Sequence, residues 1–530
     1  MSFGLTDAGP MPARITWLIV GAITLAGLVV RAIPLVLSDF PVNDGGLFVA
    51  MTRAIQEAGW SLPVTVSWNG SELPFTYPPL AFYKAGLLES LFGLDLYAIF
   101  RWFPLLTSVL IVPVVYLLAR QLLRSELGGA VAALAYALAP SSYVWMIQGG
   151  GVTRSPGLLV AVLALWQVVV LVREPTPGRA VGVGLLAGLT GLVHPGAAVF
   201  LLSGAVLIWL FEGRTRRAFV HAAAAAGIGL LVLAPWLIIV ASRFGLAALV
   251  DVPSNGPDLR FALLTMLSSR FTGLPFFDPL GVIGLTMAFV CLYRRQWLLP
   301  LWFLVATALS PQYAMVPFGL LIGAAAQSLA SKRRDVQSRP LSAPLRRFPA
   351  IGLAVLGACL AFEGVVSAFA VLDPGAPVHA LSAERREAMA WVAAELEPAA
   401  RVAVITDSVW PRDPDSEWFP LLAGRQSVAT VQGSEWLGVA AFVETRGAHH
   451  ALQTCVRQEE SVACVQEWLA EWPADYLYLP TGHLHGPSSP ADCCADLRAG
   501  LMADPSFEVV YDGPGATILW VVQPLPIQGS

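Results

Sequence analysis

Long apolar runs alternate with short polar loops over the first 371 residues of the chain. Each run reaches or approaches the roughly 20 residues that an α-helix needs to cross the hydrocarbon core of a membrane. The pattern predicts a polytopic α-helical membrane domain over residues 1–372, with about eleven spans. The runs are 15–37, 98–119, 127–147, 155–172, 180–193, 197–211, 218–241, 276–293, 297–309, 313–330 and 349–371.

Basic residues concentrate in every second loop between these runs, and the short loops between them carry few. Because cytoplasmic loops are enriched in Lys and Arg, we expect the N-terminus inside the cell. An odd number of spans then places the C-terminal part outside a plasma membrane. The basic loop residues are Arg14, Arg120, Arg124, Arg173, Arg179, Arg214, Arg216, Arg217, Arg294, Arg295, Lys332, Arg333, Arg334, Arg339, Arg346 and Arg347.

One apolar segment, 78–93, does not fit as a span. It is short, and Lys84 and Glu89 interrupt it. Counting it as a span would invert every later loop and move the arginines outside. We therefore expect an amphipathic helix at the outer membrane interface.

The composition changes near residue 373, where charged residues, Trp and Asp-Pro turns appear. Alternating strand and helix patterns predict an extracytoplasmic α/β domain over 373–530, with a largely parallel sheet. The expected helices are 383–396, 416–423, 460–471 and 490–502. The expected strands are 401–406, 427–430, 475–479, 507–511 and 516–522.

Four of the six cysteines, Cys455, Cys464, Cys493 and Cys494, fall in this C-terminal part. An even number of cysteines outside the cell indicates disulfides, and Cys455 with Cys464 is one possible pair. Free thiols are the alternative. A metal site is a weaker one, because no C-x-x-C pair has His residues at matching spacing.

Composition supports the membrane assignment and narrows the partners. Charged residues make up 13% of the chain and hydrophobic residues 56%, whereas soluble domains carry about 25% charged residues. The net charge is −4, and no basic face is visible, so nucleic acid is not an expected partner. Membrane lipid is.

The first outer loop, 38–97, is the longest polar interruption in the first 240 residues. Its sequence Asn43-Asp44-Gly45-Gly46 is typical of a turn, but Asp44 also suits a general base at the membrane surface. Glu72 is either a solvated loop carboxylate or a second catalytic carboxylate that orients the acceptor. Asp44 and Glu72 could hold a divalent metal ion with waters or act without one, so no cofactor is certain.

Cations are few on the outer side, and four of them could bind phosphate: Lys84, Arg101, Arg154 and Arg270. Their alternative role is to reach lipid headgroups. Arg154 is the strongest candidate, since it follows three glycines where a helix is expected to begin, and a helix N-terminus beside an arginine suits an anion. His194 lies at the outer end of a span, where a structural hydrogen bond is its more common role. Tyr313 also faces outward.

Four short motifs together resemble the membrane-embedded glycosyltransferases of the C superfamily. They are Asn43-Asp44, Tyr77-Pro78-Pro79-Leu80, the turn from Gly149 to Arg154, and Leu192-Val193-His194-Pro195. The resemblance covers roughly residues 15–330 and is greatest to the protein O-mannosyltransferase and aminoarabinose transferase branch. The family often has two acidic residues where this chain has Asn43-Asp44, so only Asp44 matches the catalytic carboxylate. The Trp-Trp-Asp-Tyr-Gly motif of oligosaccharyltransferases is missing from the sequence, which argues against oligosaccharide transfer to peptide sequons.

The resemblance implies a sugar donor on a polyprenyl phosphate and a lipid, glycan or protein acceptor. An acceptor hydroxyl would attack the anomeric carbon with inversion, and Asp44 would act as the base. One or more of the four outer cations would neutralise the leaving phosphate. Asn43, Tyr77, His194 and Tyr313 would line the substrate cavity. Aromatic and acidic residues in 415–420 and 433–436 could also face the site, although they match no motif.

Two other functions remain open at the level of sequence. A lipid or glycan transporter, or a flippase, would need polar groups at mid-membrane and broken helices in matching halves of the chain. A non-catalytic scaffold would use the outer domain to bind a partner. An enzyme, in contrast, predicts that Asp44 and two outer cations converge in one cavity beneath the outer domain.

Overall fold

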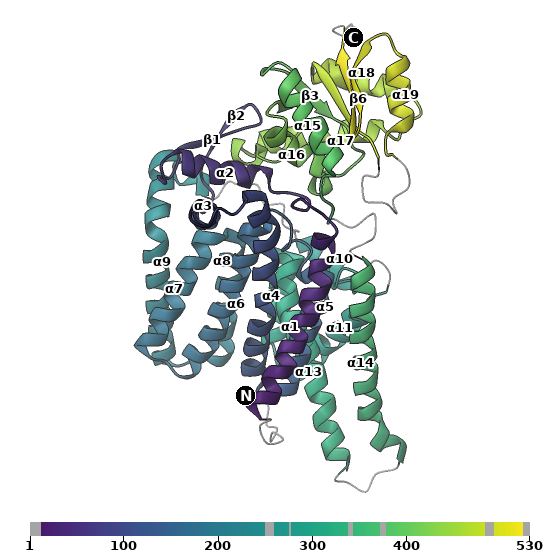
Figure 1. Cartoon of the computed structure of the whole chain (residues 1–530). Coiled ribbons are helices and arrows are strands. Elements are labelled where there is room, and N and C mark those ends of the chain that lie inside the picture. Colours follow the sequence, from purple (N-terminus) through teal and green to yellow (C-terminus); the bar gives the residue numbers. More distant parts are fainter. Residues whose placement is uncertain are drawn as a thin grey trace.

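The chain folds into a helical bundle with a mixed α/β part at one end (Figure 1). The computed structural model describes residues 12–249, 259–274, 277–337, 343–370, 378–482 and 492–522. The expected boundary at 373 and the start of the expected helix 490–502 lie outside these ranges. We call residues 378–522 the C-terminal segment.

Each of the eleven predicted runs contains a helix, although in the run 127–147 the helix ends at Leu138. Seven of these helices, within the described residues, are long and apolar enough to cross a membrane, and four others are apolar but shorter (α5, α7, α11 and α12). The number of spans therefore stays a prediction. The helices are α1 (Ala13–Val36), α4 (Leu96–Leu123), α5 (Glu126–Leu138), α6 (Gly151–Arg173), α7 (Pro177–Val193), α8 (Pro195–Glu212), α9 (Arg216–Phe244), α11 (Pro279–Tyr293), α12 (Leu298–Leu309), α13 (Pro311–Gln337) and α14 (Ala343–Ala370).

Local sequence explains several helix boundaries. The side chains of Asp95, Ser125 and Thr215 each accept a hydrogen bond from a backbone N–H in the first turn of α4, α5 and α9. Such caps satisfy N–H groups that have no partner within the helix. Pro195 and Pro311 occupy the first position of α8 and α13, where a missing N–H is tolerated. These prolines end the short runs before them, as the sequence predicts.

The outward surface of the bundle is apolar. In α9 only 17% of the most hydrophobic window is buried, and Leu230, Leu231 and Ile238 are more than half exposed. A continuous apolar surface of this kind is unfavourable in water and suits lipid. The bundle is therefore that of a multi-pass membrane protein.

The first outer loop forms two helices and a hairpin rather than an irregular loop. They are α2 (Gly46–Glu57), β1 (Thr65–Trp68), β2 (Ser71–Pro74) and α3 (Leu80–Phe92). The helix expected at 78–93 is α3, and it lies across the end of the bundle that carries the C-terminal segment (Figure 1). The outer loop 242–275 contains an unpredicted helix, α10 (Leu259–Ser268), after a short turn, η2 (Ala247–Leu249).

The C-terminal segment packs helices around one sheet with the strand order β4-β3-β5-β7-β6. Its strands are β3 (Arg401–Val404), β4 (Gln426–Ser427), β5 (Tyr476–Pro480), β6 (Phe507–Gly513) and β7 (Ala516–Val521). Its helices are α15 (Ala383–Glu395), α16 (Pro414–Leu422), α17 (Val439–Cys455), α18 (Ser461–Glu471) and α19 (Ala495–Ala503), with short turns η3 (Trp410–Arg412) and η4 (Ser434–Leu437).

The structure corrects two expectations for this segment. The sheet is mixed rather than largely parallel, because β7 pairs antiparallel with both β5 and β6. Only Pro514 and Gly515 separate β6 from β7, and so short a connection allows only antiparallel pairing. The helix α17 was also not predicted. It contains Gly447 and two adjacent histidines, residues of low helix propensity that weaken the pattern.

Both disulfides of the described residues lie in the C-terminal segment. Cys455 pairs with Cys464, and Cys493 pairs with its neighbour Cys494. The prediction of at least one disulfide is confirmed, and its candidate pair is the one formed.

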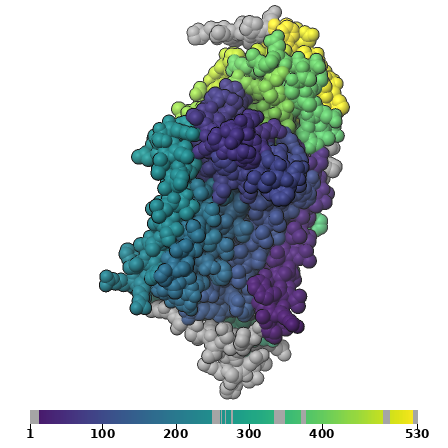
Figure 2. Space-filling model, turned by 60° about the vertical axis from the view of Figure 1, so that its left-hand side comes forward, coloured from purple at the N-terminus to yellow at the C-terminus, as the bar shows by residue number. Residues whose placement is uncertain are grey.

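The first outer loop and the C-terminal segment share one hydrophobic core. Figure 2 shows the loop, in dark purple and blue, between the bundle and the green C-terminal segment. The indole of Trp68 donates to the carbonyl of Gln432 (2.8 Å), and the Asn69 side chain exchanges two hydrogen bonds with the Ser427 backbone. The shared core includes Phe40, Leu47, Trp68, Leu73, Phe75, Met389, Val402, Trp418, Phe419 and Tyr478. This core fixes the loop against the C-terminal segment.

Candidate active site

A cavity of about 490 Å³ opens between the end of the bundle and the C-terminal segment. Three elements of the membrane part reach it: the first outer loop, the start of α6 and the start of α13. The remaining wall comes from η3, α16 and η4 of the C-terminal segment. The lining residues are Asn43, Asp44, Phe48, Trp145, Arg154, Ser310, Pro311, Gln312, Trp410, Pro411, Glu417, Gln432, Glu435 and Trp436.

Asp44 and Arg154 form an ion pair on the cavity wall. The Nη2 of Arg154 lies 2.8 Å from Oδ2 of Asp44 and 3.1 Å from Oδ1, and the backbone N–H of Gly150 donates to Oδ1 (2.9 Å). Their side chains are 12% and 18% exposed. The Nε of Arg154 is buried and has no hydrogen-bond partner among the described residues. The guanidinium therefore has a donor that Asp44 does not use.

Glycines allow this close approach. A Cβ on Gly149 would lie 1.9 Å from the carbonyl oxygen of Asp44, and a Cβ on Gly150 would lie 2.7 Å from Oδ2 of Asp44. The sequence interpretation of Gly149–Gly151 as a close-approach element is thus supported, but the group that approaches is Asp44. The Asp44 carboxylate accepts a hydrogen bond from the Gly150 N–H before the first turn of α6, where the sequence suggested that a phosphate binds.

Gly45 and Gly46 lie against the C-terminal segment. Gly45 has φ +137°, and a Cβ there would lie 3.1 Å from the Trp418 ring. A Cβ on Gly46 would lie 2.6 Å from the carbonyl oxygen of Glu417. These glycines let α16 pack directly on the loop that carries Asp44.

Hydrogen bonds tie the Asp44 turn to the C-terminal segment. The Asn43 amide donates to Oε1 of Gln148 (3.0 Å) and to the carbonyl of Pro411 (3.0 Å). The Trp418 indole donates to the carbonyl of Asn43 (2.7 Å). Asn43 lines the cavity, and its amide connects Pro411 of η3 with Gln148, which precedes α6 of the bundle. This explains why an amide can stand where the resembling family often has an acid.

Two carboxyl groups enter the cavity from the C-terminal segment. Oε1 of Glu417 accepts a hydrogen bond from the Trp410 indole (3.2 Å), and Oε2 of Glu435 accepts one from the Gly433 N–H (2.8 Å). Burial, together with the nearby carboxylates of Asp44 and Glu435, raises the pKa of Glu417 well above its usual value. Burial also raises the pKa of Glu435, to about 7. Two buried acids of the C-terminal segment with raised pKa values therefore share the cavity wall with Asp44.

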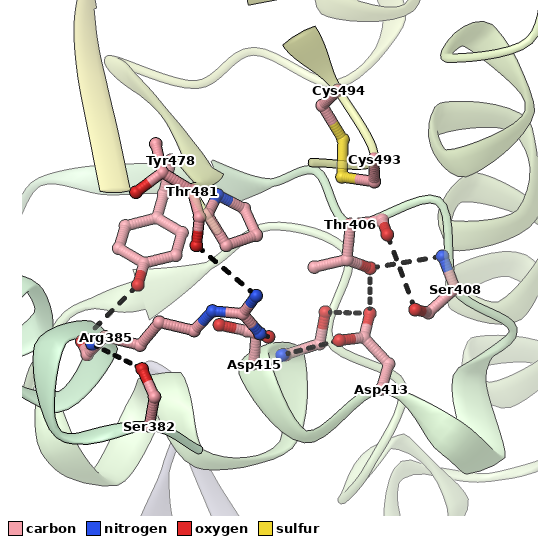
Figure 3. A network of polar contacts seen from close by, with 12 residues as sticks. Ser382, Arg385, Thr406, Ser408, Asp413, Asp415, Tyr478, Thr481, Cys493 and Cys494 are labelled. Carbon is pink, nitrogen blue, oxygen red and sulfur yellow. Dashed lines mark hydrogen bonds and ion pairs between the residues drawn. A yellow bond between two sulfur atoms is a disulfide. The ribbon is translucent and has the colours of Figure 1, made fainter. Parts of the chain in front are cut away.

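A buried polar network holds α16 in place (Figure 3). Asp413 caps the helix by accepting from the Ser416 N–H (3.1 Å), and it also accepts from the Thr406 hydroxyl (2.7 Å). Two residues further on, Asp415 pairs with Arg385 at 2.9 Å. Burial raises the pKa of Asp415 to about 6 even beside this arginine. These contacts fix the first turn of α16, which carries Glu417.

Three predicted cavity residues lie behind the wall rather than in it. The Tyr77 hydroxyl lies 3.1 Å from Oγ1 of Thr153 and 3.1 Å from Nδ1 of His194. The Tyr77 ring also packs against Phe48 and Trp436, which do line the cavity. Tyr313 is buried and stacks on Phe200. His194 therefore has the structural hydrogen bond that its position suggested, and the three residues support the wall.

The other predicted site residues lie elsewhere. Lys84 packs its Nζ 3.6 Å from the Phe103 ring centroid. Arg101 donates to the carbonyl of Leu35 at the end of α1 (2.7 Å), and Arg270 is exposed after α10. Glu72 is on the hairpin, where Thr65 and Ser67 donate to its carboxylate. None of the four lines the cavity. The expected convergence of two cations on Asp44 is therefore not met, because Arg154 is the one cation among the described lining residues. The catalytic role of Glu72 and the phosphate roles of the other three remain predictions from sequence.

The alternative of a metal site has no supporting ligand set in the part of the chain that the structure describes. No group of three or more His, Cys, Asp or Glu side chains there is arranged to hold a metal ion. Glu72 and Asp44 in particular are not brought together at the cavity.

Sequence reasoning only partly anticipated the C-terminal wall. It noted acidic and aromatic residues in 415–420 and 433–436 without assigning any of them a role. Of these, Glu417, Glu435 and Trp436 line the cavity, together with Trp410 and Gln432. The signal was their density in a segment otherwise typical of a soluble domain. A second, shallower groove of about 720 Å³ shares Trp410 and Pro411 with the cavity and extends to His449 and His450.

Comparison with a protein-family model gives a match over residues 76–239, to the dolichyl-phosphate-mannose-protein mannosyltransferases. The matched stretch contains Tyr77, the turn that leads to Arg154, and His194, but begins after Asp44. No curated protein matches the chain.

Solved structures share the fold at low identity. ArnT from Cupriavidus metallidurans, in the apo state, is 15% identical with a TM-score of 0.52, over 96% of this chain and 98% of that one. The archaeal oligosaccharyltransferase AglB from Archaeoglobus fulgidus, in complex with an inhibitory peptide and a dolichol-phosphate, is 13% identical with a TM-score of 0.54, over 88% and 69%. The arabinofuranosyltransferase AftD from Mycobacteria is 15% identical with a TM-score of 0.50, over 98% and 40%.

The family match and the shared fold together confirm the resemblance to membrane-embedded glycosyltransferases of the C superfamily, and to the branch of the protein mannosyltransferases and ArnT. The chain has the polytopic fold of that superfamily with a C-terminal α/β part. The match supports glycosyltransferase activity in general.

Proposed function

We propose that this protein transfers a sugar from a polyprenyl-phosphate-linked donor to an acceptor hydroxyl at the outer face of the membrane. The observation that carries the proposal is the Asp44–Arg154 ion pair on the wall of a cavity at the end of the bundle. A carboxylate beside a cation suits a reaction in which a hydroxyl loses a proton while a phosphate leaves. One structural relative, the oligosaccharyltransferase AglB, has been solved in complex with a dolichol-phosphate.

Arg154 is the proposed donor-phosphate residue. Its Nη2 holds Asp44, and its buried Nε has no hydrogen-bond partner among the described residues, so the guanidinium keeps a donor that a phosphate oxygen could take. A guanidinium can bind two groups at once because its five N–H donors are arranged in a planar fork. The polyprenyl chain would follow the apolar outside of the bundle. As negative charge develops on the leaving phosphate, Arg154 stabilises it in place.

Asp44 is the proposed general base. In the transfer, Asp44 takes the proton of the acceptor hydroxyl, and the hydroxyl oxygen bonds to the anomeric carbon from the face opposite the phosphate. The bond from that carbon to the phosphate oxygen breaks, and its electron pair leaves with the polyprenyl phosphate. The anomeric configuration is inverted. Gly150 and Arg154 fix the carboxylate, so little reorganisation is needed when the acceptor arrives.

The orientation follows from the charged loops. The N-terminal end of α1 lies at the opposite end of the bundle from the C-terminal segment (Figure 1), and the basic loops predict that this end is cytoplasmic. The cavity then faces outward. Cysteines introduced at the exposed positions Arg217 and Glu508 test this on intact cells with a reagent that does not cross membranes. The proposal expects labelling at Glu508→Cys only, and labelling at Arg217→Cys would reverse it.

The activity test uses purified full-length protein in detergent with a panel of radiolabelled polyprenyl-phosphate sugars. We expect acceptor-dependent release of polyprenyl phosphate, with the sugar recovered on the acceptor in inverted configuration. A transporter or flippase would move the intact donor across a vesicle membrane without cleaving it. A scaffold would bind acceptor without either change. Movement without cleavage, or binding alone, would refute the proposal.

A further inference from the structure

Glu417 lines the cavity, and one of its two carboxyl oxygens has no hydrogen-bond partner among the described residues. Glu417 is 4% exposed, and its Oε1 is held by the Trp410 indole at 3.2 Å. Its Oε2 is buried and has no hydrogen-bond partner among the described residues. A buried polar atom without a partner is unfavourable. The position on a cavity wall offers a reason for it, since a substrate can supply the missing partner.

The charges around Glu417 decide which form of the group is present. It is faced by Asp44 of the first outer loop, Glu435 of η4 and Asp413 at the start of its own helix. The cation of the cavity, Arg154, is already engaged by Asp44. Burial and these three acids all disfavour a further negative charge, and they raise the pKa of Glu417 well above its usual value. These surroundings favour the neutral form of Glu417, and a protonated carboxyl group is a hydrogen-bond donor.

The position of Glu417 on the cavity wall indicates which kind of group could partner its Oε2. The proposed donor phosphate binds at Arg154, so the attached sugar occupies the cavity between Arg154 and the C-terminal wall. Trp410 and Trp436 add aromatic faces to that wall. Aromatic faces with a few fixed polar groups are the usual composition of a small-molecule site. A sugar supplies many hydroxyl oxygens that can accept a hydrogen bond.

We propose that Glu417 is a substrate-binding residue that donates a hydrogen bond from its Oε2 to a hydroxyl oxygen of a sugar held in the cavity. The inference rests on the proposed function and adds to it. The C-terminal segment then selects the sugar, while the first outer loop and α6 carry out the transfer. The sugar belongs either to the donor or to a glycan acceptor, and the two cases change different kinetic constants.

Two substitutions of similar size separate this role from the others. Glu417→Gln keeps a side-chain donor without a titrating proton, whereas Glu417→Leu removes the donor. We expect Glu417→Gln to keep kcat/KM within about threefold of the native value at neutral pH, and Glu417→Leu to lose about 10- to 100-fold. The KM for the donor should rise if the sugar belongs to the donor, and the KM for the acceptor should rise if the sugar belongs to the acceptor. The matched control is Glu467→Gln, an exposed position on α18.

The pH profile adds a readout that a merely structural role would not change. Because the raised pKa keeps the neutral form at low and neutral pH, that form is lost as the pH rises through the folded value. Activity of the native protein should therefore fall at high pH, and Glu417→Gln should lack this decline while Glu467→Gln retains it. Infrared difference spectra of native protein and Glu417→Gln should show the C=O stretch of a protonated acid in the native protein at neutral pH.

Several results would overturn the inference. One is a Glu417→Gln protein as impaired as Glu417→Leu, which would make Glu417 an ionised base instead. Another is a Glu417→Leu protein with native kinetics, or a native spectrum without the protonated-acid band. If the native protein cleaves none of the polyprenyl-phosphate sugars, the proposed function itself fails. The spectrum distinguishes that failure, because it reports the Glu417 proton without any turnover.

Discussion

Two ion pairs between an aspartate and an arginine have nearly the same length but different surroundings. Asp44–Arg154 measures 2.8 Å, with side chains 12% and 18% exposed at the cavity. Arg385–Asp415 measures 2.9 Å inside the C-terminal segment, with side chains 3% and 1% exposed. Each pair has one buried polar atom without a hydrogen-bond partner among the described residues, Nε of Arg154 in the first and Oδ1 of Asp415 in the second. The first pair lies on the cavity wall, whereas Figure 3 shows Tyr478, Thr481 and Ser382 around Arg385 of the second.

The contrast shows that bond geometry alone does not identify a functional pair. A pair sealed away from the cavity has no contact with a substrate, so its removal should act through stability and through the placement of α16. A pair at a cavity can keep one partner while its arginine binds an incoming anion, so its removal changes turnover. Each prediction below tests one side of this contrast.

The largest expected effect is on turnover at the cavity pair. Asp44→Asn keeps the size of the side chain and an acceptor for the Gly150 N–H but removes the basic oxygen. We expect a fall in transfer rate of about 10²–10⁴-fold, the usual contribution of general base catalysis. The matched control is Glu57→Gln, an exposed carboxylate at the end of α2 in the same loop.

The same substitution should also lower the stability of the fold. Asp44 is 9% exposed and ion-paired, so some stability should be lost, and thermal unfolding must be measured beside the rate. Native-like turnover in a folded Asp44→Asn protein would remove Asp44 from the mechanism.

The sealed pair should affect folding instead. Arg385→Met leaves Asp415 buried beside Asp413 without its cation, and breaking a buried pair in this way costs about 3–5 kcal/mol of unfolding free energy. Replacing both partners, as Arg385→Met with Asp415→Leu, should recover most of the loss because no uncompensated charge remains. Denaturant titration of the three proteins tests this. A double variant no more stable than the single one would show that the pair is needed for its own sake.

Substitutions at Arg154 should affect the use of the sugar donor more than the use of the acceptor. Arg154→Ala should raise the KM for the lipid-linked donor more than the KM for the acceptor. Arg154→Lys should recover only part of the loss, because an ammonium group cannot hold Asp44 and a phosphate in one planar fork. For Arg154→Ala we expect kcat/KM for the donor to fall about 10- to 100-fold, the range that corresponds to the loss of one charge-assisted hydrogen bond. Equal loss for donor and acceptor would point to a folding role for Arg154, like that of Arg385.

The smallest effect is expected at Glu72, the second carboxylate that the sequence suggested. Its carboxylate is solvated on the hairpin and accepts from Thr65 at 2.7 Å. Glu72→Gln should change stability by less than about 0.5 kcal/mol, as exposed substitutions usually do, and should leave turnover unchanged. A large loss of turnover would place the hairpin, rather than Glu417, as the second acidic element.

Sequence periodicity could predict the helices because lipid imposes a length and a composition on every span. It also brought out Asp44 and Arg154, since a turn and a glycine-rich helix start are local patterns. The contact between them joins residues that are 110 positions apart, and no local pattern encodes it. Glu417 was harder still. Its place depends on α16 packing against Gly46, a tertiary contact between two parts that the sequence divides into separate domains.

The most direct test of the account is a structure of the protein with bound polyprenyl phosphate. The account predicts that the phosphate lies in the cavity within hydrogen-bond distance of Nε of Arg154, with Nη2 still on Asp44 and the lipid chain along the outside of the bundle. A phosphate bound at Lys84, Arg101 or Arg270, with the Asp44–Arg154 pair unchanged and away from it, would contradict the account.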